Sequence, residues 1–240
     1  MKILKFATYE EMSAAAADIL AKQINIKNDS VIGLATGSTP VGMYKKLAEM
    51  NKAGIVDFSK VRTVNLDEYY PISPDNKQSY RYFMNENLFD HINIDKNNTY
   101  VPDGSSENPD EACENLEKFI RALGGIDIQV LGIGQNGHIG FNEPEENLSL
   151  FTHKTDLTEN TIQANSRFFS EDEVMPTSAL TMGMGTIFSA KKIIMLVNGK
   201  NKREAFEQLF NDKITTANPA TLLKLHPNVT ILCDKEAYGD

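Results

Sequence analysis

The stretch Leu131-Gly132-Ile133-Gly134-Gln135-Asn136-Gly137-His138-Ile139-Gly140-Phe141-Asn142-Glu143-Pro144 places a histidine and a carboxylate five residues apart in a glycine-rich segment. The run of residues 126–131 leading into it is apolar apart from Asp127 and Gln129. A short, mostly apolar run that stops at Gly-x-Gly predicts a buried parallel strand ending in a loop. Ligands of open α/β sheets bind at the carboxyl ends of strands. His138 and Glu143 therefore lie where a substrate is expected.

Working outward from this stretch, strands and helices alternate along the chain. The expected strands cover residues 2–6, 30–34, 62–65, 127–131, 192–197 and 229–233. The expected helices cover residues 9–24, 40–50, 78–89, 110–123 and 201–210. This alternation predicts a single α/β domain over residues 1–240, with a mostly parallel sheet and helices on both faces.

Two stretches interrupt this alternation. Residues 70–76 contain two prolines and an Asp-Asn pair, which predicts a loop. Residues 142–179 are weakly periodic, and a connection of this length in a compact domain is usually functional. The segment of about residues 142–180 is predicted equally well as a lid over the site or as a surface excursion with short elements of its own.

Composition and charge narrow the class of protein. The formal net charge of −9 argues against a nucleic-acid partner, because binding to a phosphate backbone needs a basic face. No apolar run approaches the roughly 20 residues that cross a bilayer, and the N-terminus lacks a signal-peptide pattern. Cys113 and Cys233 lack metal or redox spacing, so we expect buried, reduced thiols. These features predict a cytoplasmic protein acting on a small molecule, with no membrane partner.

Two further segments carry groups suited to an anionic substrate. Gly37, Ser38 and Thr39 lie between an expected strand and an expected helix, where unpaired N–H groups can bind phosphate. A simple turn with an N-cap is the alternative, since the segment lacks the lysine of a P-loop. Arg167 and Lys202 are isolated cations that could hold a phosphate or could be solvated surface charges.

The remaining candidates are groups for proton transfer. Asp67 precedes Glu68 after an expected strand, and a carboxylate in a cleft there could take a proton from a carbon next to a carbonyl. Alone, the pair is better explained as a helix or turn cap. Neutral His138 can carry a proton near pH 7, with Asn136 and Glu143 as candidates to orient its ring. No second histidine or cysteine has metal-ligand spacing, so no metal is expected.

Taken together, these segments resemble the glucosamine-6-phosphate deaminase (glucosamine-6-phosphate isomerase) family over nearly the whole chain. The matching landmarks are Ala35 to Pro40, Asn65 to Tyr69, Gly132 to Pro144, Ser166 to Phe169 and Leu225 to Asn228. The resemblance implies a Rossmann-like fold that converts D-glucosamine 6-phosphate and water to D-fructose 6-phosphate and ammonia without a metal or redox cofactor.

The resemblance also implies a role for each candidate residue. Asp67 would move a proton from C2 towards C1, and His138 would open the pyranose ring, oriented by Asn136 and Glu143. The phosphate would be held by Gly37, Ser38, Thr39, Arg167 and Lys202. The related 6-phosphogluconolactonases share the Gly-x-Gly-x-x-Gly-His portion but lack Phe-Asn-Glu-Pro. A lactonase and a sugar-phosphate sensor are the alternative functions.

Three departures from the family pattern modify these expectations. Asn136 stands where many members have Asp, so we expect Glu143 to provide most of the electrostatic support to His138. The chain ends soon after its last expected strand, whereas allosteric hexameric members have a longer C-terminal segment. Glu145 and Glu146 would also repel a second phosphate. We therefore expect a monomer or small homo-oligomer that N-acetylglucosamine 6-phosphate does not activate.

Overall fold

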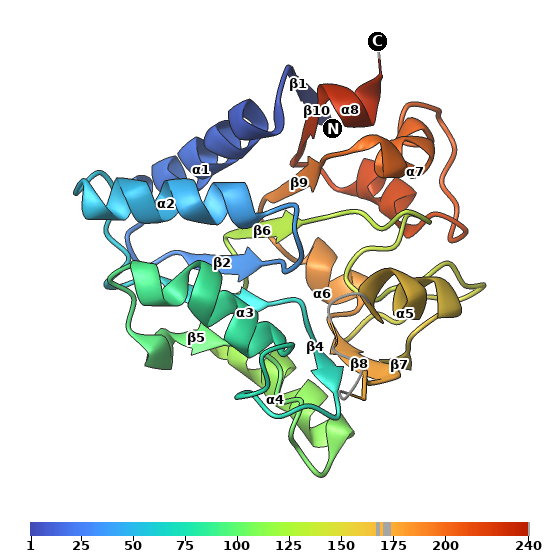
Figure 1. Ribbon diagram of the computed structural model, residues 1–240, viewed down its shortest axis with the longest axis horizontal. Helices are drawn as coiled ribbons and strands as arrows, with labels where there is room; N and C mark the ends of the chain where they lie inside the picture. The colour runs from blue at the N-terminus through green and yellow to red at the C-terminus, as the bar shows by residue number, and fades with distance from the viewer. Residues whose placement is uncertain (167–168, 170–173, 240) are drawn as a thin grey trace.

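A seven-stranded sheet of order β1-β10-β9-β6-β2-β3-β5 forms the centre of the protein in a computed structural model that describes residues 1–166, 169 and 174–239. Every neighbouring pair in this sheet is parallel. Helices pack around it, and Figure 1 shows the two termini at the same end of the molecule. The predicted α/β fold with a mostly parallel sheet is confirmed.

The elements have the following bounds. The strands are β1 (Lys2–Phe6), β2 (Val31–Leu34), β3 (Arg62–Asn65), β4 (Asp67–Tyr70), β5 (Thr99–Tyr100), β6 (Ile128–Leu131), β7 (His153–Asp156), β8 (Ser178–Thr181), β9 (Ile193–Val197) and β10 (Val229–Asp234). The α-helices are α1 (Tyr9–Ile26), α2 (Val41–Lys52), α3 (Tyr80–Asn87), α4 (Pro109–Ala122), α5 (Glu159–Ser166), α6 (Met184–Phe188), α7 (Arg203–Glu207) and α8 (Lys235–Tyr238). Short 3₁₀ turns cover Phe89–His91, Lys96–Asn98, Lys200–Lys202 and Pro219–Leu225.

The central strands are apolar because both of their faces are covered. Every residue of β2, β6 and β9 is buried, as expected for a parallel sheet between layers of helices. The one glutamine of β6, Gln129, packs beside Gly33 of β2, where a Cβ would lie only 1.9 Å from its Oε1. The glycine of β2 therefore makes room for a polar side chain inside the sheet.

The strand order reverses between β2 and β6. From β2 the chain continues outward to β3 and β5, then returns to β6 on the other side of β2 and continues to β9 and β10. In open α/β sheets a crevice forms at this point, outside the carboxyl ends of the two strands. The order of the strands thus predicts where a ligand binds.

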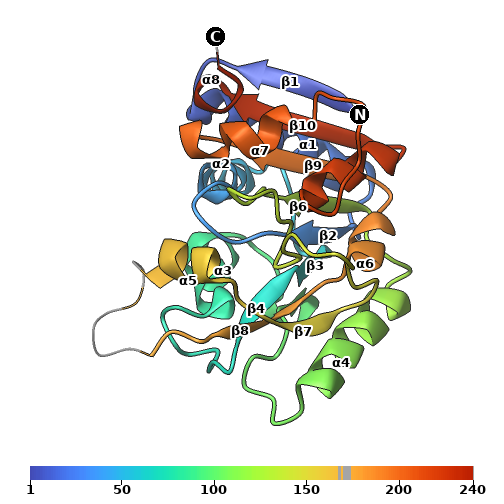
Figure 2. The ribbon, with the colours of Figure 1, turned by 90° about the vertical axis from the view of Figure 1, so that its right-hand side faces the viewer.

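A second, three-stranded antiparallel sheet of order β4-β8-β7 lies below the first in Figure 2. Asp67 and Glu68, which were predicted to follow a strand, are themselves the first two residues of the next strand, β4. Residues 142–179 contain β7, α5 and the start of β8, so this segment has elements of its own and pairs with β4. Its action as a lid stays a prediction.

Helix bounds differ from the predicted ones mainly where short 3₁₀ turns replace helix. The helix expected over residues 201–210 is a 3₁₀ turn at Lys200–Lys202 followed by the short α7. The bounds of α4 follow sequence rules, because Asn108 accepts hydrogen bonds from the backbone N–H groups of Asp110 and Glu111. Within the described ranges, no helix is long and apolar enough to cross a membrane.

Asp127 stabilises the end of the sheet that lies away from the crevice. Its carboxylate is 5% exposed and accepts hydrogen bonds from Lys27 Nζ (2.8 Å), Lys191 Nζ (2.8 Å) and the N–H of Val31 (2.9 Å). Burial raises the pKa of Asp127, but the hydrogen bonds from both lysines and Val31 outweigh it and lower the pKa below its usual value. The carboxylate therefore ties β2, β6 and the approach to β9 together.

We predict that Asp127→Asn lowers the free energy of unfolding by about 1.5–3 kcal/mol, because it weakens hydrogen bonds to a charged acceptor. Because the folded-state pKa is depressed, the difference is present above the unfolded pKa of about 3.9 and disappears as the pH falls through the folded value. Urea unfolding at neutral and acidic pH measures it. Asp29→Asn is the matched control, since the side chain of Asp29 is 58% exposed and its loss should cost less than about 1 kcal/mol. Equal costs for the two variants would contradict this role.

Candidate active site

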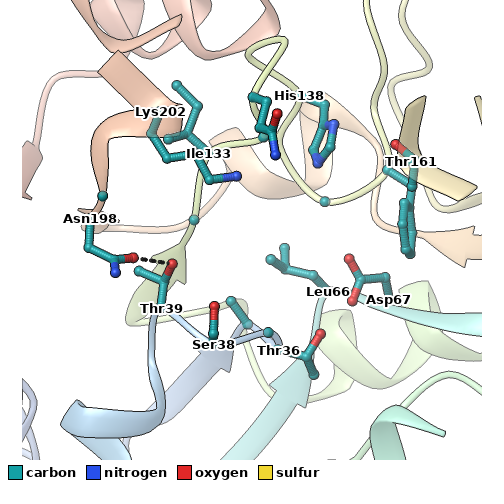
Figure 3. Close-up of a pocket in the computed structure, with 18 of the residues that line it drawn as sticks. Thr36, Ser38, Thr39, Leu66, Asp67, Ile133, His138, Thr161, Asn198 and Lys202 are labelled. Atoms are coloured by element: carbon teal, nitrogen blue, oxygen red, sulfur yellow. Dashed lines mark hydrogen bonds between the residues drawn. The ribbon is translucent and has the colours of Figure 1, made fainter. Parts of the chain in front are cut away.

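The crevice at the reversal of strand order holds a cavity of about 280 Å³. It is lined by the loops that follow β2, β3, β6 and β9, together with Tyr80 of α3 and Thr161 of α5. In Figure 3, Asp67 and His138 lie at one end of this cavity, and Ser38, Thr39 and Lys202 lie at the other. The site therefore has one end with proton-transfer groups and one end with groups suited to an anion.

Asp67 is a buried carboxylate with few polar contacts. It is 6% exposed, and its Oδ1 has no hydrogen-bond partner among the described residues. Burial, followed by the negative charge of Glu68, raises the pKa of Asp67 to about 8. A carboxylate of this kind is a stronger base than one in water. Its position at the edge of the cavity makes it available to a bound molecule.

Glu68, the next residue, faces away from the cavity and holds the start of α3. Its carboxylate accepts hydrogen bonds from the backbone N–H groups of Tyr69 (2.9 Å), Tyr80 (2.8 Å) and Arg81 (2.9 Å). Burial raises the pKa of Glu68 to about 7, although these N–H donors lower it. Glu68 therefore caps the start of α3, as the alternative explanation of the pair predicted. Of the two carboxylates, Asp67 is the one that lines the cavity.

His138 and Glu143 form a hydrogen-bonded pair across the glycine-rich loop. His138 Nδ1 lies 3.2 Å from Glu143 Oε2, and the glutamate side chain is only 2% exposed. Burial raises the pKa of Glu143, but hydrogen bonds from His138, Thr161 and Asn136 and the charge of His138 bring it down to about 2. Glu143 is therefore an ionised acceptor at neutral pH. Nδ1 of His138 must carry the hydrogen, which leaves Nε2 free to accept a proton.

Asn136 acts on this pair through the glutamate. Its Nδ2 donates to Glu143 Oε2 at 2.7 Å, and its Oδ1 accepts from the backbone N–H of His138 at 3.2 Å. The amide nitrogen faces the carboxylate, so Asn136 contacts Glu143 and not the imidazole ring itself. Close packing of the ring requires Gly134, where a Cβ would lie 2.3 Å from the imidazole.

The other end of the cavity starts at the turn after β2. Gly37 has a φ of 91°, which brings Ser38 and Thr39 to the start of α2. The hydroxyl of Tyr9 donates to the carbonyls of Ser38 (3.2 Å) and Thr39 (3.1 Å) and accepts from the N–H of Gly42 (2.8 Å). The turn is thus held by a side chain from α1.

At this end the structure also places Asn198, which the sequence did not indicate. Thr39 Oγ1 donates to Asn198 Oδ1 at 2.6 Å, drawn as a dashed line in Figure 3. The hydroxyl hydrogen of Thr39 is used in this bond, so an anion would meet the N–H groups of the turn and Lys202, which lines the same cavity. Arg167 lies outside the described residues. Asn198 could have been found by the same rule that located His138, because it directly follows the buried strand β9.

Thr161 and Tyr80 were also missed. Thr161 is in α5, within the segment whose periodicity was too weak to assign, and Tyr80 starts α3 beside the carboxylate of Glu68. Tyr80 stacks on Phe141 with ring centroids 6.2 Å apart and an interplanar angle of 7°. Neither residue follows a predicted strand, so no sequence signal pointed to them. Among the described residues, no cluster of His, Cys, Asp and Glu could hold a metal ion, and both cysteines are free and buried.

Comparison with known proteins shows the family to which this chain is similar. Residues 5–232 match the sequence model of the family described as glucosamine-6-phosphate isomerases/6-phosphogluconolactonase. The glucosamine-6-phosphate deaminase of Thermoanaerobacter pseudethanolicus is 56% identical over 99% of this chain and 94% of that protein. The one of Clostridium beijerinckii is 55% identical over 98% of each chain.

Solved structures are similar over the same range. A monomeric glucosamine-6-phosphate deaminase superposes with a TM-score of 0.96 at 44% identity, covering 99% of this chain and 98% of the other. The 6-phosphogluconolactonase of Thermotoga maritima has a TM-score of 0.77 at 22% identity, covering 97% and 98%, which shows a shared fold only. The resemblance found in the sequence is confirmed: the chain belongs to the glucosamine-6-phosphate isomerase/6-phosphogluconolactonase family, among its glucosamine-6-phosphate deaminases.

Proposed function

We propose that this protein converts D-glucosamine 6-phosphate and water to D-fructose 6-phosphate and ammonia, in the breakdown of amino sugars. The observation that carries the proposal is the cavity in which Asp67 lies opposite His138, the partner of Glu143, with the turn of Ser38 and Thr39 at the far end. An aldose–ketose isomerisation needs a proton carrier at the ring oxygen and a separate base at C2. His138 and Asp67, which come from different strand ends, are suited to these two tasks.

Ring opening is assigned to His138. Its Nδ1–H is held by ionised Glu143, so Nε2 can accept the proton of the O1 hydroxyl and return it to the ring oxygen as the C1–O5 bond breaks. The negative charge of Glu143 stabilises the imidazolium that exists between these two transfers. The product is an open-chain aldehyde, in which the hydrogen at C2 has become acidic.

Proton transfer at carbon is assigned to Asp67. The carboxylate takes the proton from C2, the electron pair forms a C1–C2 double bond, and the former carbonyl oxygen at C1 takes a proton from the C2 ammonium group, which leaves a hydroxyl at C1 and a neutral amine at C2. The Asp67 carboxylic acid then gives its proton to C1, which forms an iminium at C2, and water adds there and expels ammonia as ammonium, leaving the ketone and the ionised carboxylate. A base with a raised pKa suits this step, because transfer from carbon requires more basicity than a solvated carboxylate offers.

Phosphate binding is assigned to the N–H groups of Gly37, Ser38 and Thr39 and to Lys202, with Arg167 as a further predicted contact. Binding energy from this end of the sugar would hold C1 and C2 between Asp67 and His138. A net charge of −9 is compatible with this arrangement, since backbone N–H groups and one or two cations suffice for a phosphate.

We predict that Asp67→Asn lowers kcat by about 10²–10⁴-fold, because the amide cannot accept the C2 proton. Release of ammonia and fructose 6-phosphate measures the rate, and protection against thermal unfolding by fructose 6-phosphate tests that the site still binds. Asp75→Asn, at an exposed loop position, is the control. Turnover by Asp67→Asn near the wild-type rate would contradict the assignment. Lactone hydrolysis by a wild type that releases no ammonia would favour a 6-phosphogluconolactonase.

The pH dependence should report the same base. Since Asp67 must be ionised to act and its pKa is about 8, kcat/KM should rise as the pH is raised through about 8. Glu68→Gln removes the neighbouring charge that contributes to the raised pKa, so the rise should move to lower pH. A pH–rate profile of both proteins measures this. A wild-type profile that is flat between about pH 6 and pH 9 would be inconsistent with a titrating base.

We further propose a cytoplasmic monomer or small homo-oligomer without activation by N-acetylglucosamine 6-phosphate. Support comes from the similar structure described as monomeric and from the exposed carboxylates of Glu145 and Glu146, which would repel a second phosphate. Light scattering should give the mass of one or a few chains. Rate curves in glucosamine 6-phosphate should be hyperbolic with and without the acetylated sugar phosphate. A sigmoidal curve that becomes hyperbolic on its addition would refute the proposal.

A further inference from the structure

Thr161 places a hydroxyl group from α5 directly on the glutamate of the His138–Glu143 pair. Its Oγ1 donates to Glu143 Oε1 at 2.5 Å, and Thr161 is 3% exposed. We propose that Thr161 is a positioning residue that fixes the Glu143 carboxylate so that its other oxygen holds His138 in the orientation needed for ring opening. The catalytic consequence rests on the function proposed above, whereas the positioning itself does not.

The hydrogen bonds of Glu143 divide between its two oxygens. Oε2 receives both donors from its own loop, Asn136 Nδ2 at 2.7 Å and His138 Nδ1 at 3.2 Å. Oε1 receives the hydroxyl of Thr161, which comes from a different part of the chain. Because the glutamate side chain is 2% exposed, water has little access to replace a lost donor at Oε1. Removing the hydroxyl would leave half of a buried carboxylate unpaired and free to turn away from His138.

A second threonine directs the Thr161 hydrogen towards the glutamate. Thr158 Oγ1 donates to Thr161 Oγ1 at 3.2 Å and accepts the backbone N–H of Thr161 at 3.3 Å. The carbonyl of Thr158 accepts the N–H of Ile162 at 2.9 Å, so Thr158 also caps the N-terminal end of α5. A hydroxyl has a single hydrogen, and Thr161 already accepts from Thr158, so its own hydrogen is given to Glu143. The start of α5 is thereby linked to His138 through two hydroxyls and one carboxylate.

The kinetic test compares Thr161→Val with Thr161→Ser. The valine has a similar shape but no donor, and we expect kcat to fall by about 10–100-fold, as for lost supporting hydrogen bonds at other sites, with a much smaller change in KM. The serine keeps the hydroxyl and should restore most of kcat. Thr186→Val is the matched control, because Thr186 Oγ1 donates to Glu117 Oε1 at 2.6 Å, away from the site. Thr186→Val should lose a similar amount of stability without the loss of kcat.

The spectroscopic test uses the protein without substrate. The Nδ1–H proton of His138 should give a downfield resonance, assigned by its absence in His138→Asn. We expect this resonance in the wild type, Thr161→Ser and Thr186→Val, and its loss by exchange with water in Thr161→Val. This readout does not depend on turnover. If no glucosamine 6-phosphate were deaminated but the resonance still required the Thr161 hydroxyl, the proposed function would fail and the positioning inference would stand.

Two results would overturn the inference. One is a Thr161→Val protein that keeps both kcat and the His138 resonance, since the carboxylate would then hold its place without the hydroxyl. The other is an equal loss of kcat in Thr161→Val and Thr186→Val, with no rescue by Thr161→Ser, since the effect would then be a general loss of stability.

Discussion

The reversal of strand order between β2 and β6 is the constraint on which the rest of the site depends. Adjacent parallel strands end on the same edge of the sheet, but the chain leaves β2 and β6 towards opposite sides, so their following loops part and leave a crevice. The turn of Gly37, Ser38 and Thr39, proposed to bind the phosphate, follows β2, and His138 lies in the loop after β6. The next strands outward, β3 and β9, lead to Asp67 and Asn198. The order of the strands therefore brings side chains that are far apart in the sequence to one cavity.

Beside this crevice, two buried carboxylates have pKa values shifted in opposite directions because their neighbours differ. Asp67 has an oxygen without a hydrogen-bond partner among the described residues and a negative neighbour, and its pKa is raised to about 8. Glu143 accepts from Thr161, Asn136 and His138, and its pKa is lowered to about 2. Burial raises the pKa of both, so the hydrogen bonds to Glu143 and the charges of the neighbouring His138 and Glu68 decide the difference. One carboxylate is thereby fitted to accept a proton and the other to stay charged.

Much of this site could be predicted from the sequence, because its groups follow apolar strands. The loop from Gly132 to Pro144 and the turn at Gly37 both follow apolar runs that predict buried strands. Both lie at the carboxyl ends of β6 and β2, where ligands of open α/β sheets bind. The direction of each side chain could not be predicted. Asn136 faces Glu143, and Thr39 gives its hydroxyl hydrogen to Asn198, since such pairings depend on packing between distant segments. Residues 142–179 were the least predictable, because β8 is defined by pairing with β4, and β7 by pairing with β8, and neither by a periodicity of its own.

The small second sheet explains how the base and the histidine keep their separation. In β8, Thr181 pairs with Asp67 of β4, and its Oγ1 accepts the N–H of Phe141 at 3.0 Å. The next carbonyl along, that of Met182, accepts from Asn142 Nδ2 at 2.8 Å. β8 and the residue after it therefore hold both β4, which carries Asp67, and the loop that carries His138 and Glu143. Because these bonds are buried, a shift of either segment would break paired polar groups, at a cost of about 1–3 kcal/mol for each group left unpaired. The parallel sheet thus creates the site. The antiparallel sheet, which the strand pattern did not predict, fixes its geometry.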